Sequence, residues 1–275
     1  MSKDPLLARA QGVWQELASV PVSVPVSFGA AGEIDVVVSP GSRICPPGWV
    51  GIVLLGGAAI VTAPSREAAD RVRVAVAGLP VDRLTDPESV GGVLPTREVL
   101  GPAVLAYVAE DGFRPAAPPT GLRVEEAAAG SVDLAGLARA AGAADADEAG
   151  LDEISSPAFV VRAAGQVVAA AGYREWPGRA AHVGVLTAPA WRGRGLARAT
   201  GSSAVRHALA QGLLPQWRAR VPASRKVAVA LGFSELGSQL SVEPARAPEL
   251  RLGTARSGNG SSTMRRSNRP KGQDR

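Results

Sequence analysis

The stretch "VLTAPAWRGRGLARATGSSAVRHAL", residues 185–209, sets closely spaced glycines and arginines between a strand-like run and a helix-like run. The strand is expected to end at Thr187, because Pro189 prevents its simple continuation, and a helix begins near Gly195. The glycines let the backbone turn with its N–H groups pointing one way, and the first N–H groups of a helix have no intrahelical acceptor. Because the helix dipole adds positive potential at this end, the stretch predicts a phosphate-binding loop. Three arginines add positive charge around it: Arg192, Arg194 and Arg198.

Two common phosphate-binding loops do not fit this stretch. A Walker loop needs Gly-Lys-Ser/Thr, but here Leu196 follows Gly195. A dinucleotide fingerprint would place Arg198 where close helix–strand packing leaves no room for a side chain, and no parallel βαβ unit with a suitably placed acidic residue follows. The spacing that remains is Arg192-x-x-Gly195-x-Ala197.

This spacing resembles Arg/Gln-x-x-Gly-x-Gly/Ala, the pyrophosphate-binding signature of the GNAT acyltransferases. Residues 122–243 also resemble that family in the order of their expected elements, and "SRKVAVALGFSELG" (224–237) resembles its closing Ser…Leu-Gly-Phe segment. More faintly, residues 1–118 resemble the N-terminal region of zwittermicin-resistance-type acetyltransferases, mainly through "VLGPAVLAYV" (99–108). The resemblance implies an α+β fold: a GNAT-type mixed, mostly antiparallel sheet flanked by helices and preceded by a smaller α/β N-terminal domain.

Composition divides the chain into three segments. The Pro-rich stretch "RPAAPPTG" (114–121) is the best linker candidate. We therefore predict an N-terminal α/β accessory domain over residues 1–118, a GNAT acetyltransferase domain over 119–245 and a tail over 246–275. The tail holds eight basic residues against two acidic ones, which leaves the rest of the chain close to neutral. Few apolar residues predict that the tail is disordered.

Hydrophobic patterning predicts the elements within these segments. In the first segment we expect an amphipathic helix ending near Leu17, strands at 20–28, 33–39, 49–55 and 58–63, and a helix at 65–78 with Ser65 as its N-cap. In the second segment we expect a strand at 122–127, two Ala-rich helices on either side of "AGAADADEAG" (141–150), and three antiparallel strands over 158–188 with turns at Ala164-Gly165 and Pro177-Gly178. After these strands we expect a helix at 195–211, a strand at 215–221, a helix at 223–231 and a closing strand within 232–243.

Composition also narrows the function classes. The chain is 46% hydrophobic, as expected for a globular protein, and Cys45 is its only cysteine, so we expect neither an intramolecular disulfide nor a metal site. The most apolar run, residues 48–63, is shorter than a bilayer span and is interrupted at Gly56-Gly57, which favours two buried strands joined by a turn over a membrane helix.

The remaining composition concerns location and partners. The N-terminus carries charges throughout, unlike a secretory signal, and the Ala- and Arg-rich usage is typical of a GC-rich bacterial genome, so we expect a cytoplasmic bacterial protein. The net charge of +5 lies in the tail and aromatic residues make up only 4% of the chain, so we expect nucleic acid to bind at most weakly, through the tail.

The resemblance implies that acetyl-coenzyme A is the co-substrate and that the acceptor is a primary amine of a small molecule or peptide. Backbone N–H groups of the glycine loop would hold the pyrophosphate, and the preceding strand edge would pair with the pantetheine arm. An N–H group of that edge would stabilise the oxyanion that forms when the amine attacks. The residues that the resemblance assigns to the cofactor are Val185, Leu186, Thr187, Arg192, Gly193, Arg194, Gly195, Leu196, Ala197, Arg198 and Ser224.

The acceptor amine must lose a proton before it attacks, so a base is needed. In several members of the resembled family the catalytic carboxylate lies on the strand that precedes the glycine loop. His182 is the only side chain of this stretch that titrates near neutral pH, and it is our first candidate. Glu175, on the preceding strand, is the second. A histidine hydrogen-bonded at a strand end and an exposed surface carboxylate are the alternative interpretations. The family's tyrosine general acid falls at Ala228 and its frequent asparagine at Val221, so the usual acid is missing.

For several other residues a structural role is the preferred interpretation. We interpret Trp191 as a packing residue and His207 as structural or solvated. An acidic cluster is expected to be a solvated helix face or, less often, an attraction for a cationic acceptor: Asp145, Asp147, Glu148, Asp152 and Glu153. Two functions therefore stay open. The first is an N-acetyltransferase whose N-terminal domain shapes the acceptor site, and the second is a catalytically weak acyl-coenzyme A-binding sensor or partner-binding module.

Overall fold

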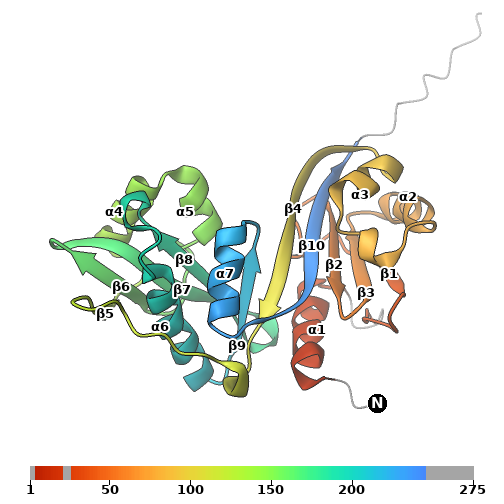
Figure 1. Cartoon of the computed structure of the whole chain (residues 1–275). Helices are drawn as coiled ribbons and strands as arrows, with labels where there is room; N and C mark the ends of the chain where they lie inside the picture. The colour runs from red at the N-terminus through yellow and green to blue at the C-terminus, as the bar shows by residue number, and fades with distance from the viewer. Residues whose placement is uncertain (1–3, 21–25, 246–275) are drawn as a thin grey trace, which may run out of the picture. The chain divides into compact units, whose positions relative to one another are not determined.

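The computed structural model describes residues 4–20 and 26–245, and the predicted tail lies outside them. Its strands form one ten-stranded sheet in the order β1-β3-β2-β10-β4-β9-β8-β7-β6-β5. All neighbouring strands are antiparallel except two pairs, β1 with β3 and β8 with β9. The mixed, mostly antiparallel sheet flanked by helices confirms the predicted fold class (Figure 1).

The bounds of the elements are as follows. The helices are α1 Pro5–Leu17, α2 Arg66–Val76, α3 Pro87–Val93, α4 Val132–Ala141, α5 Ala143–Ala149, α6 Leu196–Ala210 and α7 Pro222–Ala230. The strands are β1 Ile34–Val38, β2 Val50–Leu55, β3 Ala58–Ala63, β4 Thr96–Tyr107, β5 Val124–Ala127, β6 Ala158–Ala163, β7 Gln166–Trp176, β8 Ala180–Thr187, β9 Leu214–Ala219 and β10 Ser234–Pro244.

The N-terminal part of the sheet is covered on both faces. Alternation along β2 turns Ile52 toward α2 and α3, and turns Val53 and Leu55 toward α1, so β2 and β3 are apolar nearly throughout. Burial on both faces is the reason that residues 48–63 read as one long apolar run. The turn between the two strands uses Gly56 and Gly57 at φ +60° and +81°, as predicted.

Strand β10 joins the two halves of the chain. It follows α7 in sequence, yet it lies between β2 and β4, antiparallel to both (Figure 1). Gly237 allows this close approach, because a Cβ there would stand 1.8 Å from the carbonyl oxygen of Leu54. The sheet is therefore continuous across the Pro-rich stretch 114–121. The domain boundaries at 118/119 and 245/246 stay predictions.

The C-terminal part of the sheet has helices on both faces as well. Leu134 and Leu137 of α4 and Ala149 of α5 pack with apolar side chains of β6–β8. On the other face, Val205 of α6 packs with Tyr173 and neighbouring side chains of β7–β9. Figure 1 shows α4 and α5 together above the sheet and α6 below it.

Most predicted elements are confirmed, with three corrections. Val20 and residues 26–28 are not in a strand, and residues 21–25 lie outside the described part of the chain. Two prolines in that run disfavour a strand. The second Ala-rich helix, α5, lies within residues 141–150 and does not follow them, because a glycine at φ +91°, Gly142, ends α4 and starts α5 directly. The N-terminal prediction also missed α3 and β4. Ser65 caps α2 as expected, since its hydroxyl accepts from Ala68 N–H at 3.1 Å.

We predict that Gly237→Ala destabilises the fold by about 1–3 kcal/mol, because the new methyl group meets backbone atoms of β2. Gly12→Ala is the matched control, since Gly12 lies within α1 with no atom close to the added Cβ, and it should leave the protein equally or slightly more stable. Urea unfolding of both variants measures the difference. Equal free energies of unfolding for the two variants would show that β10 and β2 are not in close backbone contact at Gly237.

Candidate active site

Strand β9 lies between β8 and β4, and its pairings with these two strands are offset along its length. It pairs with β8 through Ala180↔Leu214, Ala181↔Pro215 and His182↔Gln216 and no further. From Gln216 to Ala219 it pairs with β4. Strand β8 continues to Thr187 against β7, so its other edge has no strand partner over residues 183–187. The parallel strands therefore separate just after His182.

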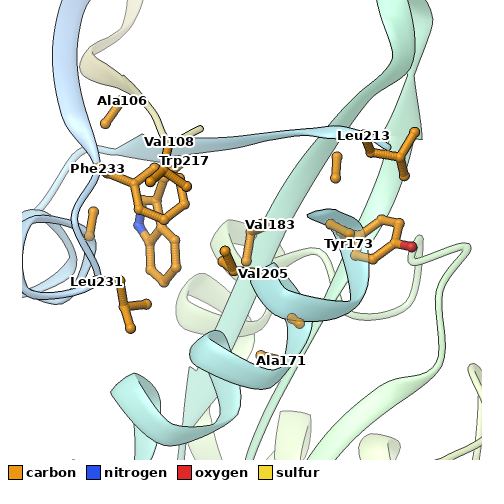
Figure 2. Packing of buried hydrophobic residues seen from close by; sticks show 14 of the residues in the cluster. Ala106, Val108, Ala171, Tyr173, Val183, Val205, Leu213, Trp217, Leu231 and Phe233 are labelled. Carbon is orange, nitrogen blue, oxygen red and sulfur yellow. The ribbon is translucent and has the colours of Figure 1, made fainter. Parts of the chain in front are cut away.

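Trp217 stands at this point on the α6 face. Its ring lies edge-on to Phe233 at 5.5 Å between centroids, and its Nε1 donates to the Ser224 hydroxyl at 2.9 Å. A Cβ on Gly201 of α6 would stand 3.3 Å from the ring. Figure 2 shows Trp217 with Phe233 and Leu231 on one side of this cluster and Tyr173 on the other. The hydrogen bond gives Ser224 a structural partner, whereas the resemblance implies that it contacts the cofactor.

The glycine loop lies beyond the free end of β8. A short 3-10 turn, Pro189–Trp191, follows the strand, and Gly193 and Gly195 have φ +76° and +78°. No side chain caps α6, and the first intrahelical acceptor is the Gly195 carbonyl, bonded by Ala199 N–H at 3.1 Å. Backbone N–H groups of 193–198 thus have no acceptor within the described residues. A Cβ at either glycine would meet open space, so the loop is accessible to a ligand.

Two of the three predicted loop arginines have protein partners. The Arg192 guanidinium pairs with Asp145 of α5, and its Nε donates to the Thr187 carbonyl at 3.2 Å, which ties the loop to the end of β8. Arg194 stacks over Trp191, 4.6 Å from the ring centroid, and Trp191 is partly buried against apolar residues, as expected of a packing residue. Arg198 is exposed on the first turn of α6. The Thr187 hydroxyl is buried with no hydrogen-bond partner in the described structure.

A cavity of about 170 Å³ opens on the other face of the sheet, between the strands and the C-terminal end of α5. Gly184 lines the cavity, and its lack of a side chain lets α5 approach β8 closely, because a Cβ there would stand 2.0 Å from the Ala149 carbonyl oxygen. The polar residues that line the cavity are Asp147, Glu148, Glu153, Arg174, His182 and Arg218, together with Trp176. The predicted base His182 is therefore at the cavity.

His182 is held by two neighbours, Trp176 and Gln216. Its ring stacks on Trp176 at 4.2 Å between centroids, and its Nδ1 contacts the Gln216 amide oxygen. Trp176 in turn lies edge-on to Trp14 of α1, which donates to the Tyr107 hydroxyl at 2.6 Å. Burial, with a smaller effect of the Arg218 charge, lowers the pKa of His182 to about 3. The imidazole is thus neutral at physiological pH, and Nδ1–H donating to Gln216 leaves the Nε2 lone pair free.

The second base candidate lies on the opposite face. Arg174 is the cross-strand partner of His182, so alternation along β7 turns Glu175 away from the cavity, to the face of Tyr173. Glu175 is exposed, and Tyr173 bonds His207 of α6, whose interpretation as a structural histidine this supports. The structure brings His182 to the cavity and does not bring Glu175 there.

The chain has two tyrosines, and neither lies at Ala228, where the resemblance implies a general acid. Tyr107 is fully buried, and its hydroxyl is held by Trp14. Tyr173 is 4% exposed and lies on the α6 face. Ala228 is a buried residue of α7, and Val221 precedes that helix.

The acidic cluster is more than a solvated helix face. Asp145 pairs with Arg192, Glu148 with Arg220 and Glu153 with Arg174. These ion pairs connect α5 and the following loop to the strands and to the glycine loop. They position the cavity wall, a role that the sequence did not suggest.

Two further cavity-side residues were missed, Gln216 and Arg218. They are two residues apart on β9, hence on one face, in a strand that is otherwise almost wholly buried. Gln216 is fully buried, and its Nε2 has no partner among the described residues. Two polar side chains at alternate positions of "LLPQWRA" (213–219) were the available signal, because a purely structural strand in this place needs none.

Comparison with known families agrees with this geometry. Residues 157–238 match the family model described as GNAT acetyltransferase, from the start of β6 into β10. Residues 157–238 are thus similar to a GNAT acetyltransferase domain. The matched residues include both the glycine loop and the point where β8 and β9 separate. The comparison with curated proteins gave no match.

Solved structures with similar folds include three GNAT proteins. An acetyltransferase assigned to the GNAT family from Novosphingobium aromaticivorans is 23% identical, with 54% of this chain and 65% of that chain covered at a TM-score of 0.41. An acetyltransferase from Colwellia psychrerythraea is 13% identical, with 66% and 75% covered at 0.45. A tandem GNAT protein from the clavulanic acid biosynthesis pathway is 12% identical, with 90% and 97% covered at 0.44. The chain thus spans about two thirds of the length of the first.

No helix in the described ranges is long and apolar enough to cross a membrane. Within the same ranges, no three His, Cys, Asp or Glu side chains are grouped so that they could hold a metal ion.

The environment of His182 predicts a pH-dependent stability. In the unfolded chain its imidazole takes up a proton below its ordinary pKa of 6.5, whereas in the folded chain it stays neutral until about pH 3. The unfolded state therefore binds more protons in this window, and the free energy of unfolding falls as the pH falls through it. Replacing His182 with Gln should remove about 2 kcal/mol of that loss between pH 7 and about pH 5. Urea unfolding of both proteins at the two pH values measures it, and identical pH dependence would contradict the low pKa.

Proposed function

We propose that the protein transfers an acetyl group from acetyl-coenzyme A to a primary amine of a small molecule or peptide. The observation that carries this proposal is the free edge of β8 over residues 183–187, which leads directly to the uncapped N-terminus of α6. The extended pantetheine arm of acetyl-coenzyme A would fit the free strand edge, and the pyrophosphate at the end of that arm would fit the helix N-terminus. We propose the cytoplasm as the place of the reaction.

The loop and the first turn of α6 suit a pyrophosphate. Six consecutive backbone N–H groups, 193–198, are without acceptors in the described structure, and the helix N-terminus adds positive potential. Arg194 and Arg198 supply charge nearby, while Arg192 is engaged with Asp145 and holds the loop. We propose that Val185, Leu186 and Thr187 offer their backbone to the pantetheine arm. The unpartnered Thr187 hydroxyl is a further polar contact for it.

The proposed chemistry needs a base and a stabilised oxyanion. We propose His182 as the base, because its Nε2 lone pair is free and it lines the cavity next to the strand separation. An N–H group of the β8 edge would stabilise the negative charge on the thioester oxygen. The thiolate departs without a tyrosine, which is feasible because thiols have a pKa of about 8.5.

The N-terminal segment contributes to this site in our proposal. Strand β4 pairs with the edge of β9 opposite to β8 and continues to Ala219, past the end of the β8 pairing, and Trp14 of α1 supports Trp176 against His182. Both contacts support an accessory role of residues 1–118 in shaping the acceptor cavity.

A binding module without turnover is the second candidate, favoured by the missing tyrosine at Ala228 and by the low basicity of His182. Coenzyme A release over a panel of amines and peptides separates the two. Thermal stabilisation by acetyl-coenzyme A without release on any acceptor would favour the binding module.

We predict that Gly195→Glu abolishes measurable acetyl-coenzyme A binding, through steric block and like-charge repulsion at the pyrophosphate. Any side chain at the φ of +78° of Gly195 is strained, so the control must carry the same strain. Gly165→Glu is this control, because it adds the same side chain at φ +79° in the open, exposed turn between β6 and β7. Calorimetry of both variants measures the affinity. Unchanged affinity in Gly195→Glu would contradict the loop assignment.

We also predict that His182→Ala lowers kcat by roughly 10²-fold or more, with little change in KM for acetyl-coenzyme A. Glu175→Gln is the comparison and should keep most of the activity, since that side chain points to the other face. Steady-state kinetics at a saturating acceptor concentration gives both values. Survival of turnover in His182→Ala with collapse in Glu175→Gln would assign the base to Glu175.

A further inference from the structure

The charges that line the His182 cavity are not all compensated. Glu153 pairs with Arg174, and Glu148 pairs with Arg220. Asp147 stands exposed on α5 at the rim. Arg218 is the remaining charge, and its environment differs from that of the others.

Arg218 is partly buried in the cavity wall without a counter-ion. In residues 4–20 and 26–245 its only hydrogen-bond partner is the Gln239 amide oxygen, at 3.4 Å from Nη1, a long bond to a neutral group. Gln239 is itself 5% exposed, and its amide nitrogen donates a hydrogen bond to the Ile44 carbonyl. Burial lowers the pKa of Arg218 from its ordinary value, in keeping with a cation that has lost water without gaining a carboxylate. A guanidinium in this state is suited to bind an anion in bidentate fashion.

The strand register puts this cation next to the proposed base. Gln216 is paired with His182, and Arg218 is two residues further on the same face of β9, about 7 Å along the strand. This is the direction in which β9 leaves β8. A ligand whose amine lies at His182 would therefore reach Arg218 with a group only a few bonds away. Asp147 at the rim would attract the ammonium form of the same ligand.

We propose that the acceptor is a small amine that also carries a carboxylate, held by an ion pair between that carboxylate and Arg218. This inference rests on the proposed function, since it names the substrate class of the same site. The acid group places the amine against the His182 imidazole, and the acetyl product, an N-acetyl amino acid, keeps the carboxylate and its partner. Arg218 is a binding residue for the acceptor in this arrangement.

The ion pair also changes the base. The groups that face His182 are Arg218 of β9, Arg174 of β7 and Gln216, with Glu153, Glu148 and Asp147 across the cavity. The Arg218 charge opposes protonation of the imidazole, so a carboxylate bound to it weakens that opposition. An acid-bearing acceptor would thereby raise the basicity of the group that takes its proton.

The first test compares matched pairs of acceptors that differ only in the carboxylate: tyrosine with tyramine, histidine with histamine, and phenylalanine with phenethylamine. Coenzyme A release should give a kcat/KM about 100-fold higher for the acid-bearing member that fits, mainly through KM. In Arg218→Gln the two members should become nearly equal, and Arg218→Lys should restore part of the preference. Arg97→Gln, which removes an exposed arginine paired with Glu243 far from the cavity, is the control and should keep the full preference.

Aminomethylphosphonate against glycine distinguishes a phosphate-type anion from a carboxylate, and preference for the phosphonate would overturn the carboxylate assignment. A wild-type preference for the decarboxylated amines, or an unchanged preference in Arg218→Gln, would overturn the proposal.

A second readout is independent of turnover. Calorimetry with the N-acetyl amino acids and their uncharged amides should show binding of the acids alone, lost in Arg218→Gln, and the imidazole signals of His182 by NMR should show a raised pKa only with the acids. Equal binding of acids and amides would refute the ion pair. Binding of the acids with no acetyl transfer to any acceptor would instead refute the proposed function and the acceptor role with it, while leaving Arg218 as an anion site.

Discussion

The end of the β8–β9 pairing at His182↔Gln216 is the constraint on which the rest of the site depends. A parallel pair that stayed in register would close the edge of β8 with its own hydrogen bonds. Here β9 pairs with β8 over only three residues, while its opposite edge pairs with β4 from Gln216 to Ala219, so the edge of β8 is open from residue 183 onward. Trp217 and its contacts with α6 and α7 fill the space on one face, and the His182 cavity occupies the other. The opening is thus built into the sheet.

The N-terminal segment is part of this constraint. Strand β4, which pairs with the edge of β9 opposite to β8, comes from that segment, and β10 is inserted between β4 and β2. Helix α1 reaches the same cavity through Trp14 and Trp176. Residues 1–118, for which the sequence predicts an accessory domain, share one sheet with residues 119–245, because each part supplies strands that pair with strands of the other.

The sequence was sufficient for features that depend on local patterns. The glycine loop was predictable because positive φ angles at Gly193 and Gly195 and an uncapped helix start follow from neighbouring residues. Alternation likewise gave β6–β8 and their turns. Alternation did not reveal which of His182 and Glu175 reaches the cavity, because that depends on which helices cover each face of the sheet. The Arg192–Asp145 pair and the cavity role of Arg218 join positions far apart in the chain, and β4 was missed because its partners, β9 and β10, follow more than 100 residues later.

Hydrogen–deuterium exchange with and without coenzyme A tests whether the free edge of β8 and the glycine loop form the cofactor site, since it reports on backbone N–H groups along the whole chain. We expect slower exchange on coenzyme A binding at residues 183–187 of β8 and at the glycine loop with the first turn of α6, residues 193–198. We expect no change in β1, at the opposite edge of the sheet. Protection confined to other segments, with 183–187 and 193–198 unchanged at saturating coenzyme A, would contradict the claim that the strand separation and the loop form the cofactor site.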